Sequence, residues 1–218
     1  MICSLEAPRL VSYVGRQLDQ YFPDGDSHDL ERVVRRALER TEHCFGPVRL
    51  QPYRDGDRPR FDHLHSDQYA TFLYLASNEA HRQGNPRLAS KLYCLNKALN
   101  GLMCTYDTEL PEHFLLFHTV GMMLGKASYG DYFVAFHHCT VGTDRGTPPR
   151  FGRGTVLYGG SGVVGRCEVG DWVSVGAQSL VRNADVPSDH VVGGISPALV
   201  IKPARRRIAA EYFDLPGS

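Results

Sequence analysis

The chain has 218 residues, and its 24 Lys and Arg residues balance its 24 Asp and Glu residues, so its formal net charge is zero. This balance argues against a nucleic-acid-binding protein held by a basic field and against a polybasic protein on a membrane surface. Hydrophobic residues make up 42% of the chain, which is enough to form a core and excludes general disorder.

The sequence predicts a cytoplasmic protein. It has no apolar run of about 18 residues, as a membrane-spanning helix needs, and its N-terminus carries charges where a secretory signal is apolar. The cysteines show no C-x-x-C pair and no zinc-finger spacing, so we expect reduced, mostly buried thiols. They are Cys3, Cys44, Cys94, Cys104, Cys139 and Cys167.

Apolar residues recur at helical spacing in the first half of the chain, which predicts an α-helical domain. A first helix ends at the turn Pro23-Asp24-Gly25, and Ser27 is expected to cap a second helix that ends at Gly46-Pro47. Residues 48–65 are rich in Pro, Arg and Asp and are predicted to form a long loop.

Two further helices are predicted before residue 105. Ser66 is expected to cap a third helix that runs to Gly84. Asn85-Pro86 should open a fourth helix that extends to about Leu102, because asparagine caps helices well and proline fits the first turn.

The second half of the chain has a six-residue period, and most of the 22 glycines lie in it. The apolar position is occupied by Phe151, Leu157, Val163, Val169, Val175 and Val181. An earlier run has the same period at Phe117, Met123, Tyr129, Ala135 and Val141. The two runs are out of phase, so residues 143–150 are predicted to form an inserted loop.

A period of six fits neither an α-helix nor a flat strand. It is typical of a β-helix in which each hexapeptide contributes one short strand and a tight corner. The strands of such a β-helix form the sides of a three-sided prism. The branched apolar residue of each hexapeptide points into this prism, and glycine allows the backbone conformation that the tight corner needs.

The chain from residue 92 onward also contains several short motifs. They are Leu92-Tyr93-Cys94-Leu95-Asn96-Lys97, Leu110-Pro111, His118-Thr119-Val120-Gly121-Met122-Met123-Leu124-Gly125, Cys139-Thr140-Val141-Gly142, Val175-Gly176-Ala177-Gln178-Ser179, Asp185-Val186-Pro187, Val192-Gly193-Gly194-Ile195-Ser196-Pro197 and Ile201-Lys202-Pro203. On these motifs the stretch from about Tyr93 to Pro203, about half of the chain, resembles the hexapeptide-repeat acyltransferases, and among these the serine O-acetyltransferase-like proteins.

The resemblance implies an α+β protein of three parts: a helical domain over residues 1–105, a left-handed parallel β-helix over 106–203 and a tail over 204–218. It also implies a homotrimer, or a dimer of trimers joined by the helical part, with active sites between neighbouring prisms.

The implied reaction is direct acetyl transfer from acetyl-CoA to a small hydroxyl acceptor, serine or a serine-like amino acid, as in cysteine biosynthesis, with no metal and no acyl-enzyme. The hydroxyl must lose its proton to a base whose pKa is about 7. His118 matches the catalytic histidine of the family. Asp107 is the expected carboxylate that orients this histidine, with Glu109 as second choice.

The resemblance also assigns binding residues. The pantetheine arm should lie along Gly159 and Ala177, and Lys202 is a candidate for the nucleotide phosphates. Two positions depart from serine acetyltransferases: Phe117 replaces an aspartate, and the loop has Thr147-Pro148-Pro149 in place of its histidine. Phe117 is therefore expected to contact an altered acceptor.

The same loop contains Arg145, whose positively charged side chain could bind an acceptor carboxylate. The chain ends in Leu215-Pro216-Gly217-Ser218 and lacks the C-terminal isoleucine with which bacterial serine acetyltransferases dock into cysteine synthase. That partner is not predicted.

Three alternatives remain open from the sequence. The acceptor could be a sugar hydroxyl or amine, or the β-helix could be a non-catalytic scaffold. A third hypothesis is metal-dependent hydration on the same kind of prism, as in the γ-class carbonic anhydrases. Its candidate ligands are His113, His118, His137 and His138.

Overall fold

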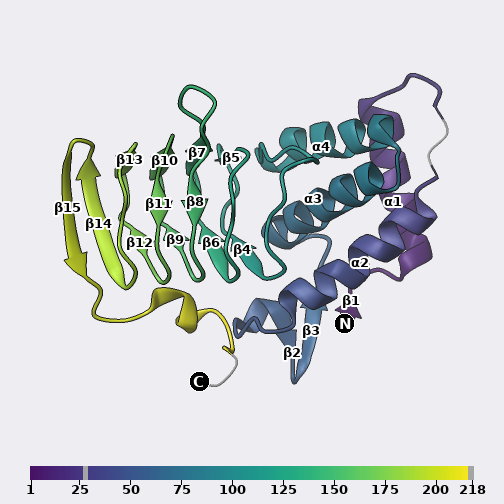
Figure 1. Cartoon of the computed structure of the whole chain (residues 1–218). Helices are drawn as coiled ribbons and strands as arrows, with labels where there is room; N and C mark the ends of the chain where they lie inside the picture. The colour runs from purple at the N-terminus through teal and green to yellow at the C-terminus, as the bar shows by residue number, and fades with distance from the viewer. Residues whose placement is uncertain (27–28, 216–218) are drawn as a thin grey trace.

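A computed structural model of the chain describes residues 1–26 and 29–215 and shows a helical part beside a left-handed parallel β-helix (Figure 1). The α+β fold predicted from the six-residue period is confirmed. No helix within the described residues is long and apolar enough to cross a membrane.

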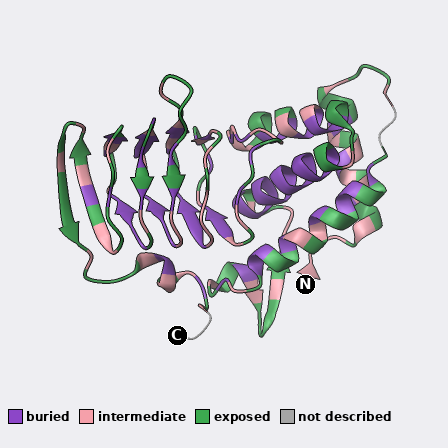
Figure 2. Cartoon of the chain, viewed as in Figure 1, coloured by how far each residue is buried: buried purple, intermediate pink, exposed green. Residues whose placement is uncertain are grey.

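The described residues of the N-terminal part contain four α-helices, as predicted. They are α1 (Ala7–Tyr21), α2 (Glu31–Phe45), α3 (Ser66–Arg82) and α4 (Pro86–Asn100). Helix α3 lies at the centre and is buried on all sides from residue 67 to residue 80 (Figure 2). A helix surrounded in this way exposes no face to solvent, so packing contacts on all sides fix its position.

The predicted helix starts were right at one position and wrong at another. The Asn85 side chain caps α4 by accepting a hydrogen bond from the Leu88 backbone N–H at 3.0 Å. Ser66, expected to cap α3, is instead its first residue and follows a cap position at His65. Ser27 lies outside the described residues.

Residues 48–65 are not the long loop that their composition predicted. They contain a short helix η1 (Gln51–Tyr53) and a hairpin of β2 (Arg54–Asp55) and β3 (Arg58–Phe61), and β1 (Ile2–Cys3) pairs with β3. Gly56 turns the hairpin with φ of 59°. Asp55 pairs with Arg58, so the loop is Gly56-Asp57, a two-residue hairpin signal that the charged and proline-rich composition of the segment obscured.

The β-helix is built from three parallel faces. The first contains β4 (Phe114–Leu116), β6 (Phe133–Ala135), β9 (Val156–Leu157), β12 (Ser174–Val175) and β14 (His190–Ile195). The second contains β5 (Met123–Leu124), β7 (Thr140–Gly142), β10 (Gly162–Val164) and β13 (Leu180–Arg182). The third contains β8 (Arg150–Phe151) and β11 (Glu168–Val169).

One apolar residue from each strand stacks on the next inside the prism. On the first face the stacked positions are Leu116, Ala135, Leu157, Val175 and Val192. All of these side chains are fully buried. Burying a valine or leucine side chain contributes about 1.5–3 kcal/mol, so this column is a main source of the stability of the β-helix.

The predicted inward positions fail only at the first corner. Phe117 and Met123 were expected inside, but Leu116 pairs with Ala135, and Leu124 pairs with Val141. Both leucines are fully buried. Eight positions separate these leucines, so the corner between β4 and β5 is longer than a regular hexad. The later inward residues follow the prediction.

The chain leaves the regular prism at two places. The loop predicted over residues 143–150 lies between β7 and β8 and projects from the prism (Figure 1), but it ends one residue earlier because Arg150 is the first residue of β8. After β14, the strand β15 (Ala198–Pro203) runs antiparallel to it. The following segment, with η2 (Ile208–Glu211), returns along the prism toward α2, where Phe213 bridges to Val48.

Candidate active site

His118 lies at the long corner between β4 and β5. Its backbone has φ of 53°, a left-handed conformation, and its side chain is 73% exposed. A cavity of about 570 Å³ opens beside it, between the prism and the helical part. The cavity is lined by Leu50, Pro52, Tyr53, Leu64, His65, Ser66, Asp67, Phe117 and His118.

Asp67 holds His118 from the first turn of α3. One carboxylate oxygen accepts a hydrogen bond from the backbone N–H of His118 at 3.0 Å, and the other lies 3.7 Å from Nδ1 of its ring. Only 5% of the Asp67 side chain is exposed. At 3.7 Å this second contact is too long for a hydrogen bond, so the Asp67 carboxylate acts on Nδ1 through its charge and favours a proton on that nitrogen over Nε2.

Asp107 is not the carboxylate beside His118, contrary to the sequence prediction. It lies 2.7 Å from the Lys126 ammonium and accepts a hydrogen bond from the Thr105 hydroxyl at 2.7 Å. These two hydrogen bonds, that from Lys126 first, lower the pKa of the Asp107 carboxyl. The second choice, Glu109, pairs with Arg82 at 2.7 Å.

Asp67 lies 51 residues before His118, so neither the motif around the histidine nor the hexad period points to it. The signal available was an aspartate directly after Ser66 at the start of a predicted helix, but such a position is usually explained by the helix dipole alone.

The residues that follow the inward positions of the first face form a ridge along the corner of the prism. His118, His137, Gly159 and Ala177 each stand two positions after a stacked residue of successive strands. The His118 and His137 rings are 6.4 Å apart. A Cβ on Gly159 would lie 2.6 Å from Nε2 of His137, so only glycine fits beneath this ring.

Gly159 and Ala177 are thus on the same ridge as His118, and Ala177 is exposed. Lys202 lies on β15, at the end of the prism, and is exposed. Arg145 lies in the inserted loop. Within the described parts of the chain, no hydrogen bond or ion pair joins Lys202 or Arg145 to His118.

The inserted loop is anchored to the prism by Asp144. Its carboxylate accepts hydrogen bonds from Asn183 at 2.7 Å and from Arg182 at 3.0 Å, and these bonds lower the pKa of Asp144. Arg145, the next residue in the loop, is exposed.

Phe117 is part of an aromatic wall beside His118. Its ring stacks on Phe136 with centroids 4.9 Å apart, and Phe136 stacks on Tyr158 at 5.5 Å. Tyr212, from the returning C-terminal segment, closes on Phe117 at 5.3 Å. The site is therefore apolar on one side of the histidine.

The proposed ligands of a metal-dependent hydratase do not converge within the described residues of one chain. His137 and His138 have ring centroids 5.7 Å apart, and His138 packs over Gly121, whose Cβ would lie 2.4 Å from its ring. His113 belongs to another cluster, with His43 and Glu112.

Comparison with known proteins finds no family model that matches the chain. Two curated relatives are serine acetyltransferases. That of Synechococcus elongatus is 27% identical over 168 residues, 73% of this chain and 64% of the relative, so the match spans less than two thirds of that relative. That of Staphylococcus xylosus is 25% identical over 149 residues, 66% of this chain and 68% of the relative.

Solved structures of serine acetyltransferases share the fold. The enzyme of Neisseria gonorrhoeae aligns over 97% of this chain and 86% of its own with a TM-score of 0.71 and 18% identity. The structure of this enzyme in complex with serine aligns over 91% of this chain and 84% of its own, with a TM-score of 0.68 and 19% identity. The serine acetyltransferase of Brucella abortus in complex with coenzyme A aligns over 91% of this chain and 74% of its own, with a TM-score of 0.60 and 15% identity. The resemblance inferred from the motifs is confirmed.

Proposed function

We propose that the protein is an acetyl-CoA-dependent O-acetyltransferase that acts directly on the hydroxyl of serine or a serine-like amino acid. The single observation that carries the proposal is His118, an exposed imidazole at the family's catalytic position, held by the buried Asp67 at the edge of a cavity. The relatives named serine acetyltransferases, and the structures bound to serine and to coenzyme A, support this choice of substrates.

The proposed reaction has one covalent step on the acetyl group. Nε2 of His118 takes the proton of the acceptor hydroxyl while the hydroxyl oxygen attacks the thioester carbonyl. The new C–O bond forms, the C–S bond breaks, and the CoA thiolate leaves with the proton returned by the imidazolium. Asp67 stabilises that imidazolium, and no metal or acyl-enzyme takes part.

Acetyl-CoA is proposed to lie along the corner ridge, against Gly159 and Ala177, with Lys202 near its phosphates. Small residues there let the pantetheine arm approach the backbone closely. Within the described residues of one chain no hydrogen bond or ion pair joins Arg145 to His118, so we propose a homotrimer, or a dimer of trimers, in the cytoplasm. There the loop of a neighbouring chain covers the acceptor, and its arginine binds the acceptor carboxylate.

The aromatic wall favours an acceptor with more apolar surface than free serine. Phe117 offers no charge to an amino group, and it is fixed by Phe136 and Tyr212. A modified serine or homoserine has apolar surface to pack against the aromatic wall and a carboxylate to bind Arg145. A sugar is the second candidate acceptor.

Replacing Ala177 by tryptophan should raise the KM for acetyl-CoA by about tenfold, which corresponds to roughly 1.4 kcal/mol of lost binding. The indole would fill the ridge on which the pantetheine arm lies, while kcat and the KM for the acceptor change little. Ala98, exposed on α4, supplies the control Ala98→Trp. An unchanged KM for acetyl-CoA in Ala177→Trp would remove this residue from the binding surface.

The substrate assignment is tested by mass spectrometry of products formed from acetyl-CoA and a panel of acceptors. The panel contains serine, homoserine, N- or O-substituted serines, and sugars. We expect one acetylated hydroxyl product, with an amino acid preferred over every sugar. Binding of acetyl-CoA without acetylation of any acceptor would instead support a scaffold.

A further inference from the structure

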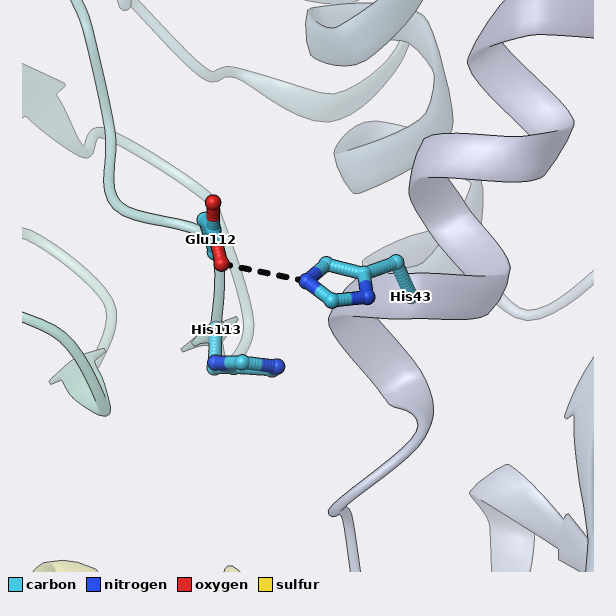
Figure 3. A group of neighbouring side chains, drawn as sticks. All are labelled: His43, Glu112 and His113. Atoms are coloured by element: carbon cyan, nitrogen blue, oxygen red, sulfur yellow. Dashed lines mark hydrogen bonds and ion pairs between the residues drawn. The ribbon is translucent and has the colours of Figure 1, made fainter.

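Three side chains with metal-binding atoms meet where α2 lies beside the chain that enters β4 (Figure 3). His43 comes from the last turn of α2, and Glu112 and His113 come directly before β4. One ligand atom from each residue lies within 4.8 Å of the other two, and in residues 1–26 and 29–215 this is the one group of its kind. It links the helical part to the β-helix.

His113 is already fixed in the orientation that a metal ligand needs. Asp131 lies 2.9 Å from its Nδ1 and also accepts its backbone N–H at 2.8 Å. The ring stacks on Tyr132 with centroids 5.2 Å apart. A carboxylate on one ring nitrogen places the proton there and leaves the Nε2 lone pair outward, as in metal sites where an acid supports a histidine ligand.

His43 and Glu112 complete the group from the exposed side. Their nearest atoms, Nε2 and Oε2, lie 3.2 Å apart. An ion pair between His43 and Glu112 would explain their contact. It would not explain why the His113 ring lies beside them, with its centroid 4.8 Å from that of His43. A shared cation could accept lone pairs from both imidazoles and from the carboxylate.

The charges around the group do not oppose a cation. The adjoining cavity contains Arg40 and Arg82, but Arg40 lies 3.5 Å from Glu79, and Arg82 lies 2.7 Å from Glu109. Arg36 is likewise paired with Glu39. The three arginines of the adjoining cavity are therefore each paired with a carboxylate, and Glu112 adds a negative charge to the group.

We propose that His43, Glu112 and His113 bind one Zn²⁺ or a similar borderline divalent cation, which clamps α2 to the β-helix. Two imidazoles and one carboxylate suit zinc, whereas Mg²⁺ and Ca²⁺ prefer oxygen ligands alone. Donors around tetrahedral zinc lie about 3.4 Å apart, so small rotations of the exposed His43 and Glu112 side chains close the site. Water would take the remaining position. The site is separate from His118 and independent of the proposed acetyl transfer.

The test uses the full-length, tag-free protein after removal of metal by a chelator. Co²⁺ is titrated with detection of its visible absorption, and Zn²⁺ binding is measured by calorimetry. We expect one equivalent per chain with a tetrahedral cobalt spectrum. The exposed-site variants His43→Asn and Glu112→Gln should each weaken Zn²⁺ binding by about tenfold or more.

The matched control is His81→Asn, because His81 is an exposed histidine at the end of another helix, α3. It should bind Zn²⁺ as the unaltered chain does. Zn²⁺ should also raise the thermal midpoint of the unaltered chain and not that of His43→Asn. The proposal is overturned if micromolar Zn²⁺ does not bind, or if binding and the thermal shift persist in His43→Asn.

Discussion

Substitution of His118 by asparagine is expected to lower kcat for acetyl transfer by about 10³-fold, within the range contributed by a general base. Asparagine is similar in size and keeps the backbone N–H that donates to Asp67, but its side-chain amide cannot take a proton from the acceptor. Because His118 is 73% exposed, its loss creates no internal cavity, and the thermal midpoint should stay within a few degrees.

The measurement is the steady-state rate of CoA release, together with CoA affinity by calorimetry and the assembly state by light scattering. The CoA affinity and the assembly state should match those of the unaltered protein. A loss of rate would then come from the chemical step and not from weaker binding. The control His190→Asn alters a histidine on β14, at the other end of the prism, and should retain full rate. A His118→Asn rate within a few-fold of the unaltered protein would refute the assignment.

Replacement of Asp67 by asparagine should lower kcat by about 10²-fold, less than loss of the base itself. The amide oxygen can still accept the His118 backbone N–H, so the left-handed corner is kept. The negative charge opposite Nδ1 is lost, which removes the preference for the productive tautomer and the stabilisation of the imidazolium.

Asp107→Asn is the matched control, since it removes an aspartate charge whose partners are Lys126 and Thr105. It should leave kcat nearly unchanged and cost at most about 1 kcal/mol of stability, as for exposed ion pairs. The KM for acetyl-CoA should be unchanged in both variants. If Asp107→Asn loses more activity than Asp67→Asn, the sequence-based partner was right and the geometric one is wrong.

The regular part of the fold could be predicted because each hexad repeats one local requirement, an apolar residue that points into the prism. Leu157, Val175 and their neighbours satisfy it, and they lie where the period places them. The period failed between Leu116 and Leu124, where a longer corner carries His118. An irregular corner that holds a functional residue is a common reason for such a failure.

The candidate site could be predicted only in part. The motif around His118 lies within a few residues of sequence, and so does Phe117. The contact between Asp67 and His118 joins a buried helix to the prism across 51 residues, and periodicity carries no information on such a contact. The packing of Tyr212 against Phe117 is also long-range, because the C-terminal segment returns along the whole prism.

The most direct test of the account is the initial rate of CoA thiol release at saturating acetyl-CoA, with and without serine or homoserine. We predict release that depends on the hydroxyl acceptor and that disappears when His118 is replaced by asparagine. Thiol release at the same rate without acceptor, or no release with any hydroxyl compound, would contradict acetyl transfer at this site.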